Sequence, residues 1–160
     1  MVIENYDQGI RLNNPLNFGI TNSILRNTYS HCIYVNNTRT RDNKIYNSEF
    51  YNSSTGSGLV IYGSTVDIIS CNITQNVQGF TIMNRSNVTI EKSPDTEPWF
   101  MDSIIEDNSL EEILFYDDCQ LHLADNRNQI IDNDFIIGSL DEFLIHCPNL
   151  EIEKDFSYNY

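Results

Sequence analysis

The sequence predicts an all-β protein whose short strands stack in parallel as a coiled solenoid of about six turns. First, the 160 residues include 21 Ile and 21 Asn but a single Ala, Ala124, a composition that favours strands and turns over helices. Second, short segments with alternating apolar residues recur along the chain. Third, Asn, Ser, Gly and Asp separate these segments, and such residues accept tight turns.

One recurring segment begins with a small residue and continues with alternating apolar positions, which is typical of a half-buried strand. Its members are GIRLNN from Gly9, CIYVNN from Cys32, GLVIYG from Gly58, GFTIMN from Gly79 and the weaker EFLIHC from Glu142. SLEEILFYDD is the best helix candidate, but it lines up with GLVIYG. We therefore predict a strand there as well.

A second segment begins with Ile and has a small residue three positions on. Its members are ITNSIL from Ile20, IYNSEF from Ile45, IISCNI from Ile68 and IIDNDF from Ile130, with Ser23, Ser48, Cys71 and Asn133 as the small residues. A third segment comprises STVDII around Val66, NVTIEK from Asn87, QLHLAD from Gln120 and NLEIEK from Asn149.

The recurrent Ile or Leu residues define the repeat. They are Ile20, Ile45, Ile68, Ile90, Leu123 and Ile152, separated by 25, 23, 22, 33 and 29 residues. Units of this length cannot close on themselves, so we expect them to stack with like side chains over like side chains. The same alignment predicts Ser23, Ser48 and Cys71 in one ladder and Asn27, Asn52 and Asn76 at equivalent corners.

With this pattern established, IENYDQGIRL from Ile3 and ITQNVQGFTI from Ile73 resemble the repeat of the right-handed parallel β-helix family. The resemblance covers nearly the whole chain and implies a right-handed parallel β-helix. Relatives include polysaccharide lyases, glycoside hydrolases, viral tail spikes and surface proteins, so it also implies work on a polysaccharide or glycan. We expect a noncatalytic carbohydrate-associated or scaffold module that is extracellular, at the cell surface or in a virion.

The domain organisation is expected to be simple, with residues 1–160 forming one β-helical domain. The family caps its first coil, yet no cap is legible at the start of this chain. We therefore expect a segment of a longer protein, or an oligomer or further domains that cover the coil ends. No membrane span and no signal peptide are predicted.

Charge is unevenly distributed within the formal total of -14. Up to Pro94 there are 6 acidic and 7 basic residues, whereas from Asp95 onward there are 17 acidic and 2 basic ones. A nucleic-acid partner is therefore not expected, because such proteins cluster Lys and Arg. The acidic half leaves a protein-interaction module as another alternative. The four cysteines have no metal-ligand spacing and are expected to be mainly free thiols.

Enzymes form the main alternative, a polysaccharide hydrolase or lyase. Asp95, Asp117, Asp118 and His146, followed by Lys154, resemble in order the catalytic run of polygalacturonase-type β-helices, which implies acid and base catalysis. Their spacing does not match one ladder, and the glycines that surround the family's His are missing. A lyase would need Arg127 or Lys154 as its base. No cofactor is expected, although Asp117, Asp118 and Asp125 could hold calcium instead of being ordinary exposed carboxylates.

Aromatic residues indicate where a sugar could bind, because sugar rings stack on the faces of Tyr and Trp. Tyr34, Tyr62 and Tyr116 fall at alternating strand positions, and Trp99 lies in the insertion SPDTEPWF. We predict these four as carbohydrate-binding residues. The alternative is that tyrosine simply suits the outer face of a sheet.

Overall fold

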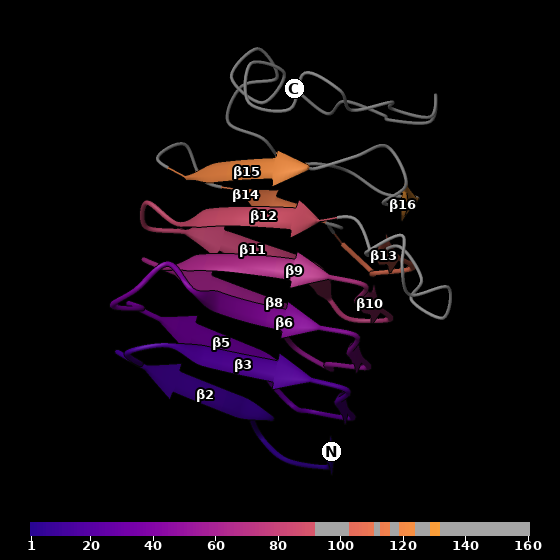
Figure 1. Cartoon of the computed structure of the whole chain (residues 1–160). Coiled ribbons are helices and arrows are strands. Elements are labelled where there is room, and N and C mark those ends of the chain that lie inside the picture. The colour runs from indigo at the N-terminus through magenta and orange to yellow at the C-terminus, as the bar shows by residue number, and fades with distance from the viewer. Residues whose placement is uncertain (92–102, 111–112, 116–118, 124–128, 132–160) are drawn as a thin grey trace.

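The protein is an all-β parallel solenoid. The computed structural model describes residues 1–91, 103–110, 113–115, 119–123 and 129–131, which form sixteen strands and no helix. Within these ranges there is accordingly no helix able to cross a membrane. Figure 1 shows the strands stacked one above another, from the N-terminal end upward.

Three parallel sheets run along the stack. Sheet A contains β1 (Val2–Glu4), β4 (Ile24–Arg26), β7 (Glu49–Tyr51), β10 (Asn72–Thr74), β13 (Ile104–Glu106) and β16 (Gln129–Ile131). Sheet B contains β2 (Ile10–Asn13), β5 (Ile33–Asn36), β8 (Ser57–Tyr62), β11 (Gln78–Met83) and β14 (Ile113–Phe115). Sheet C contains β3 (Phe18–Thr21), β6 (Asn43–Tyr46), β9 (Thr65–Ile69), β12 (Asn87–Glu91) and β15 (Gln120–Leu123).

Each coil contributes one strand to every sheet, in the order A, B, C. The described residues complete five such sets, and β16 begins the next, slightly short of the predicted six coils. Strand β14 confirms that the segment around Ile113 is a strand and not a helix, with Ile113 paired to Phe80.

The predicted isoleucine ladder fills the core. Ile20 pairs with Ile45, Ile45 with Ile68, Ile68 with Ile90 and Ile90 with Leu123 in sheet C. Ile45, Ile68 and Ile90 have no exposed surface. Burial of side chains of this size stabilises the fold by about 1.5–3 kcal/mol each. Ile152 lies outside the described residues.

The small residues at the corner between sheets C and A form the predicted ladder as well. The Ser48 hydroxyl donates to the carbonyl oxygen of Tyr46 at 2.9 Å and accepts the backbone N–H of Ser23 at 3.2 Å. One coil further on, Cys71 takes the equivalent place, and its N–H donates to the Ser103 hydroxyl at 3.1 Å. Each member thereby supplies hydrogen bonds to a buried turn, where an unpaired N–H would be costly.

Two details of the predicted alignment are wrong. Ile130 pairs with Ile105 in sheet A, so IIDNDF does not occupy the place of Ile20, which Leu123 takes in its coil. Asn76 does not follow Asn52 at the exposed corner, because Gln75 holds that left-handed position. Asn76 lies one residue further on, 2% exposed, and donates to the carbonyl oxygens of Phe50 and Thr74.

Candidate functional site

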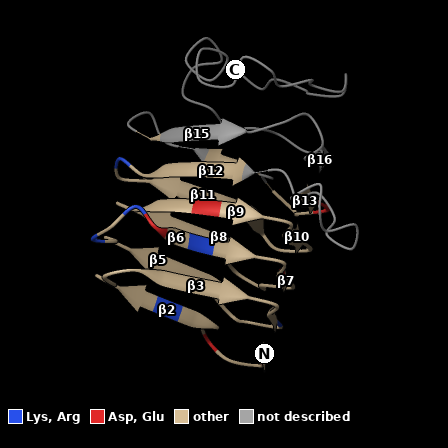
Figure 2. Cartoon of the chain, viewed as in Figure 1, with Lys and Arg blue, Asp and Glu red and all other residues tan. Residues whose placement is uncertain are grey.

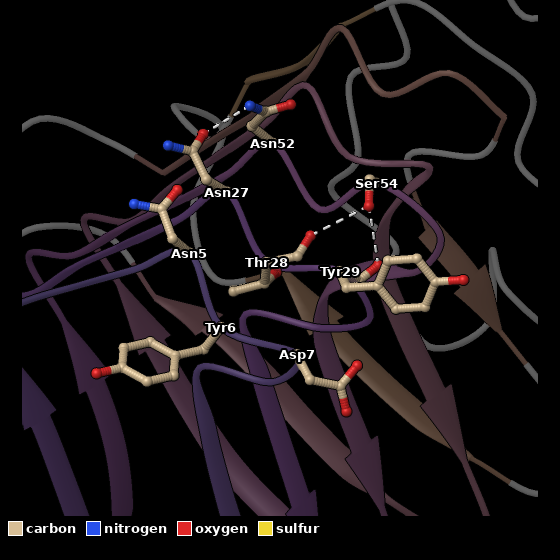
Figure 3. Close-up of a pocket in the computed structure, with 8 residues that line it drawn as sticks. All are labelled: Asn5, Tyr6, Asp7, Asn27, Thr28, Tyr29, Asn52 and Ser54. Carbon is tan, nitrogen blue, oxygen red and sulfur yellow. Dashed lines mark hydrogen bonds between the residues drawn. The ribbon is translucent and has the colours of Figure 1, made fainter.

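A polar pocket lies where the turns that follow β1, β4 and β7 stack on one another. It has a volume of about 610 Å³. We call it the corner pocket, and Figure 3 shows the residues that line it, Asn5, Tyr6, Asp7, Asn27, Thr28, Tyr29, Asn52 and Ser54.

Hydrogen bonds between successive coils hold the pocket in place. The N–H of Tyr29 donates to the Tyr6 carbonyl oxygen at 2.9 Å, and the N–H of Ser54 donates to the Thr28 carbonyl oxygen at 2.9 Å. The Asn52 side-chain amide donates to the Asn27 Oδ1 at 2.6 Å. These contacts fix the backbone of three consecutive turns, so the pocket is built before any ligand enters.

Two tyrosines flank the pocket with their rings free. Tyr6 is 64% exposed and Tyr29 is 63% exposed. The Asp7 carboxylate and the Tyr29 ring extend to the same side in Figure 3, with Ser54 above them, whereas the Tyr6 ring points to the other side. An aromatic face beside a carboxylate and hydroxyls is a combination that suits a polyhydroxylated ring.

His31 lies directly after the turn of Tyr29. Its Nδ1 accepts the backbone N–H of Ser57 at 3.1 Å, and its ring lies 6.1 Å from that of Tyr34. Burial lowers the pKa of His31, although the Asp7 charge opposes this effect. Burial thus favours the neutral imidazole. His31 does not line the corner pocket, and Asp7 is the only acidic residue among the described residues that do.

The predicted sugar-binding tyrosines of sheet B are half-buried. Tyr34 carries the Arg11 guanidinium 5.1 Å from its ring centroid, so one part of its ring is occupied. Tyr34 is in register with Val60, while Tyr62 is in register with Asn36, so the two tyrosines belong to different rows of the sheet. Their role in binding stays a prediction.

The remaining predicted site residues lie outside the described part of the chain. These are Asp95, Trp99, Tyr116, Asp117, Asp118, Asp125, Arg127, His146 and Lys154. The hydrolase, lyase and calcium hypotheses rest on them and stay predictions. Within the described ranges, no cluster of three or more His, Cys, Asp or Glu side chains could hold a metal ion.

The described cysteines are structural. Cys32, Cys71 and Cys119 are buried free thiols. Burial raises the pKa of Cys32 to about 11 and that of Cys71 to about 12, so both stay protonated near neutral pH. A nucleophilic role is not supported, because nucleophilic cysteines have lowered pKa values and some exposure.

Charged residues are sparse on the strands of sheets B and C. Figure 2 shows a basic residue on β6 beside an acidic one on β9; they are Lys44 and Asp67, which are in register. Burial raises the pKa of Asp67, and the nearby Lys44 charge opposes this shift. These sheet faces therefore offer no concentrated charge among the described residues.

Sequence patterns missed the residues of the corner pocket, because Tyr6, Asp7 and Tyr29 lie in turns and not at alternating strand positions. The available signal was the position of the turns themselves. Asn5 and Asn27 both have positive φ, and an exposed tyrosine follows each within two residues. An aromatic residue just after a repeated corner Asn would have indicated this site.

Comparison with models of protein families supports the solenoid fold. A family model described as a right handed beta helix region matches residues 8–134. Neither the search of curated proteins nor the search of solved structures found a match.

Proposed function

Because the chain belongs to the right-handed β-helix family, we propose that it is a noncatalytic scaffold module that binds a glycan at the corner pocket. The proposed setting is extracellular, at a cell surface or in a virion, as the resemblance of the repeat implies. The observation that carries the proposal is that the exposed Tyr29 and the Asp7 carboxylate line the same pocket, on a preformed frame of stacked turns.

The chemistry of the lining supports binding of a neutral sugar. Tyr29 supplies an aromatic face, Asp7 accepts hydrogen bonds, and the corner amides both donate and accept them. Sugar hydroxyls also both donate and accept, so they can satisfy such a lining without a charge of their own. A uronate would be disfavoured next to Asp7.

The noncatalytic part of the proposal follows from the number of carboxylates. Hydrolysis of a glycosidic bond uses two carboxyl groups on opposite sides of that bond. Among the described residues that line the corner pocket, Asp7 is the only acidic one. We therefore assign Asp7 to ligand binding, and the enzyme alternatives depend on residues elsewhere in the chain.

The test is a screen of neutral oligosaccharides, followed by calorimetric titration of the best binder with the Tyr29→Ala protein. We expect affinity to fall about tenfold, since one aromatic stacking contact contributes about 1 kcal/mol beyond its buried area. Tyr29→Phe keeps the ring and should retain most of the affinity. Because Tyr29 is 63% exposed, neither change should disturb folding.

Tyr62→Ala tests the competing site, because Tyr62 is one of the sheet B tyrosines predicted to bind a sugar and lies outside the corner pocket. It should bind as the native protein does. If Tyr62→Ala instead removes binding while Tyr29→Ala does not, the glycan lies on sheet B and the corner assignment is wrong. If the native protein binds no oligosaccharide, the carbohydrate proposal itself fails.

A further inference from the structure

A second pocket lies at the other end of the sheet A strands, at the corner between sheets C and A. Its volume is about 390 Å³. One side consists of the corner row Asn22, Asn47 and Ser70, and the other of Glu49 and Asn72. We call it the second pocket. It shares no lining residue with the corner pocket.

Ser70 interrupts the row of corner amides. Asn22, Asn47 and Ser70 have the same left-handed backbone, with φ of 48°, 47° and 55°. The Asn47 side-chain amide donates to the Asn22 Oδ1 at 2.7 Å. A serine side chain is too short to extend this ladder, so the chain of amide hydrogen bonds stops at Asn47.

The Ser70 hydroxyl has no hydrogen-bond partner within the described ranges. Ser70 is 8% exposed, and its Oγ makes no hydrogen bond within the part of the chain that the structure describes. A buried hydroxyl in this condition costs about 1–3 kcal/mol. An asparagine would suit the left-handed backbone and could continue the ladder, so the serine leaves both space and an unsatisfied polar group at the pocket.

The rest of the lining defines which ligand fits. Glu49 and Asn72 lie in a row of sheet A between Ile24 and Ile104. The row thus offers hydrogen-bonding groups between two aliphatic side chains. Glu49 is the only acidic or basic residue among the described residues that line the pocket, so an anion would be repelled.

We propose that the second pocket binds a small uncharged polyol, with the Ser70 hydroxyl as a hydrogen-bonding partner. A polyol hydroxyl satisfies Ser70 and can donate to Glu49 or to an amide oxygen, while its C–H groups contact Ile24 and Ile104. The pocket is of a size that holds small ligands. This site is independent of the proposed glycan site and uses different residues.

The experiment is a titration of isotope-labelled protein with glycerol and with methyl glucoside, followed by the backbone amide signals. We expect saturable shifts at Asn47, Ser70 and Asn72. Glucuronate, as the anionic probe, should bind more weakly because of Glu49. Tyr29→Ala should leave these shifts unchanged, which separates this site from the corner pocket.

Two substitutions of Ser70 test whether the second pocket binds a polyol through this hydroxyl. Ser70→Ala removes a hydroxyl that has no hydrogen-bond partner among the described residues, so the fold should persist while affinity for the polyol falls about three- to tenfold. Ser70→Asn should fill the pocket, abolish the saturable shifts and raise the unfolding temperature by continuing the ladder. The assignment is overturned if the native protein shows no saturable shift, since water alone then satisfies Ser70, or if Ser70→Ala binds as tightly as the native protein.

Discussion

Asparagine is abundant because every coil needs residues with left-handed backbone at its corners. In the described part of the chain, twelve non-glycine residues have positive φ, and eight of them are Asn. Asn tolerates this conformation better than most residues, and its amide can bond to the coil below. The sequence therefore predicted Asn27 and Asn52 at a corner. It misassigned Asn76, because Gln75 has the left-handed backbone at that corner although it is not an asparagine.

At the scale of single residues, His31 makes the free energy of unfolding depend on pH. Its folded pKa is lowered below the ordinary value of 6.5, because burial disfavours the imidazolium. The unfolded chain therefore binds the proton more readily. The stabilising contribution of His31 is present above about pH 6.5 and is lost as pH falls through its folded pKa.

We expect His31→Asn to flatten this dependence, because the Asn Oδ1 can still accept the N–H of Ser57 but does not titrate. Urea unfolding at a series of pH values between about 7 and 5 measures the difference between the two proteins. The two other histidines are common to both proteins and cancel in the comparison. An identical slope in both proteins would contradict the assigned cause.

At the scale of elements, the ladders explain which registers the sequence predicts well. A ladder of identical residues, such as Ile20, Ile45 and Ile68, leaves a visible period in the sequence. The position of Ile130 was predicted wrongly because both sheet A and sheet C place an apolar residue at similar spacing. The pairing of Ile130 with Ile105 shows that Ile130 belongs to sheet A and not to sheet C.

The ladder formed by Ser23, Ser48 and Cys71 predicts how much one hydrogen bond between coils contributes to the free energy of unfolding. Ser48→Ala should reduce the free energy of unfolding by about 1–3 kcal/mol, because it removes the partner of the buried Ser23 N–H. Ser48→Cys is the matched control and should cost less, since Cys71 fills the same place one coil on. Urea denaturation measures both. Equal losses in the two variants would mean that packing, and not hydrogen bonding, determines the stability of this ladder.

At the scale of the whole molecule, the described strands pair with the equivalent strands of the neighbouring coils. Stability of such a solenoid is close to a sum of nearest-neighbour terms. The first coil has a neighbour on one side in the described structure, and its apolar residues Ile3, Ile10 and Leu12 are only partly buried. Leu59 and Ile61 in the third coil have no exposed surface.

In this chain, local opening should therefore cost less in the first coil than in the third. We expect backbone amides of β1 to β3 to exchange with solvent fastest and those of β8, which pairs with strands on both sides, to exchange slowest. Hydrogen exchange followed by mass spectrometry measures the gradient. Uniform protection along the stack would indicate that the protein unfolds as one cooperative unit instead.

The sequence predicted the class of fold well and the site poorly, for one physical reason. Burial of a repeated core imposes a period on the strands, which a single chain reveals. The proposed binding residues Tyr29 and Asp7 lie in turns, and the strand period that reveals the buried core does not extend to these side chains. The acidic residues proposed for catalysis lie outside the described residues and stay untested.

The spacing of coils at the corner between sheets C and A has a practical consequence. Asn72 is paired with Glu49, 23 positions earlier, but with Ile104, 32 positions later, and the Ser103 hydroxyl still receives the Cys71 N–H. The longer connection between Asn72 and Ile104 thus leaves the strand register on either side unchanged. A foreign peptide inserted there could be displayed on the scaffold while the flanking rungs keep their alignment.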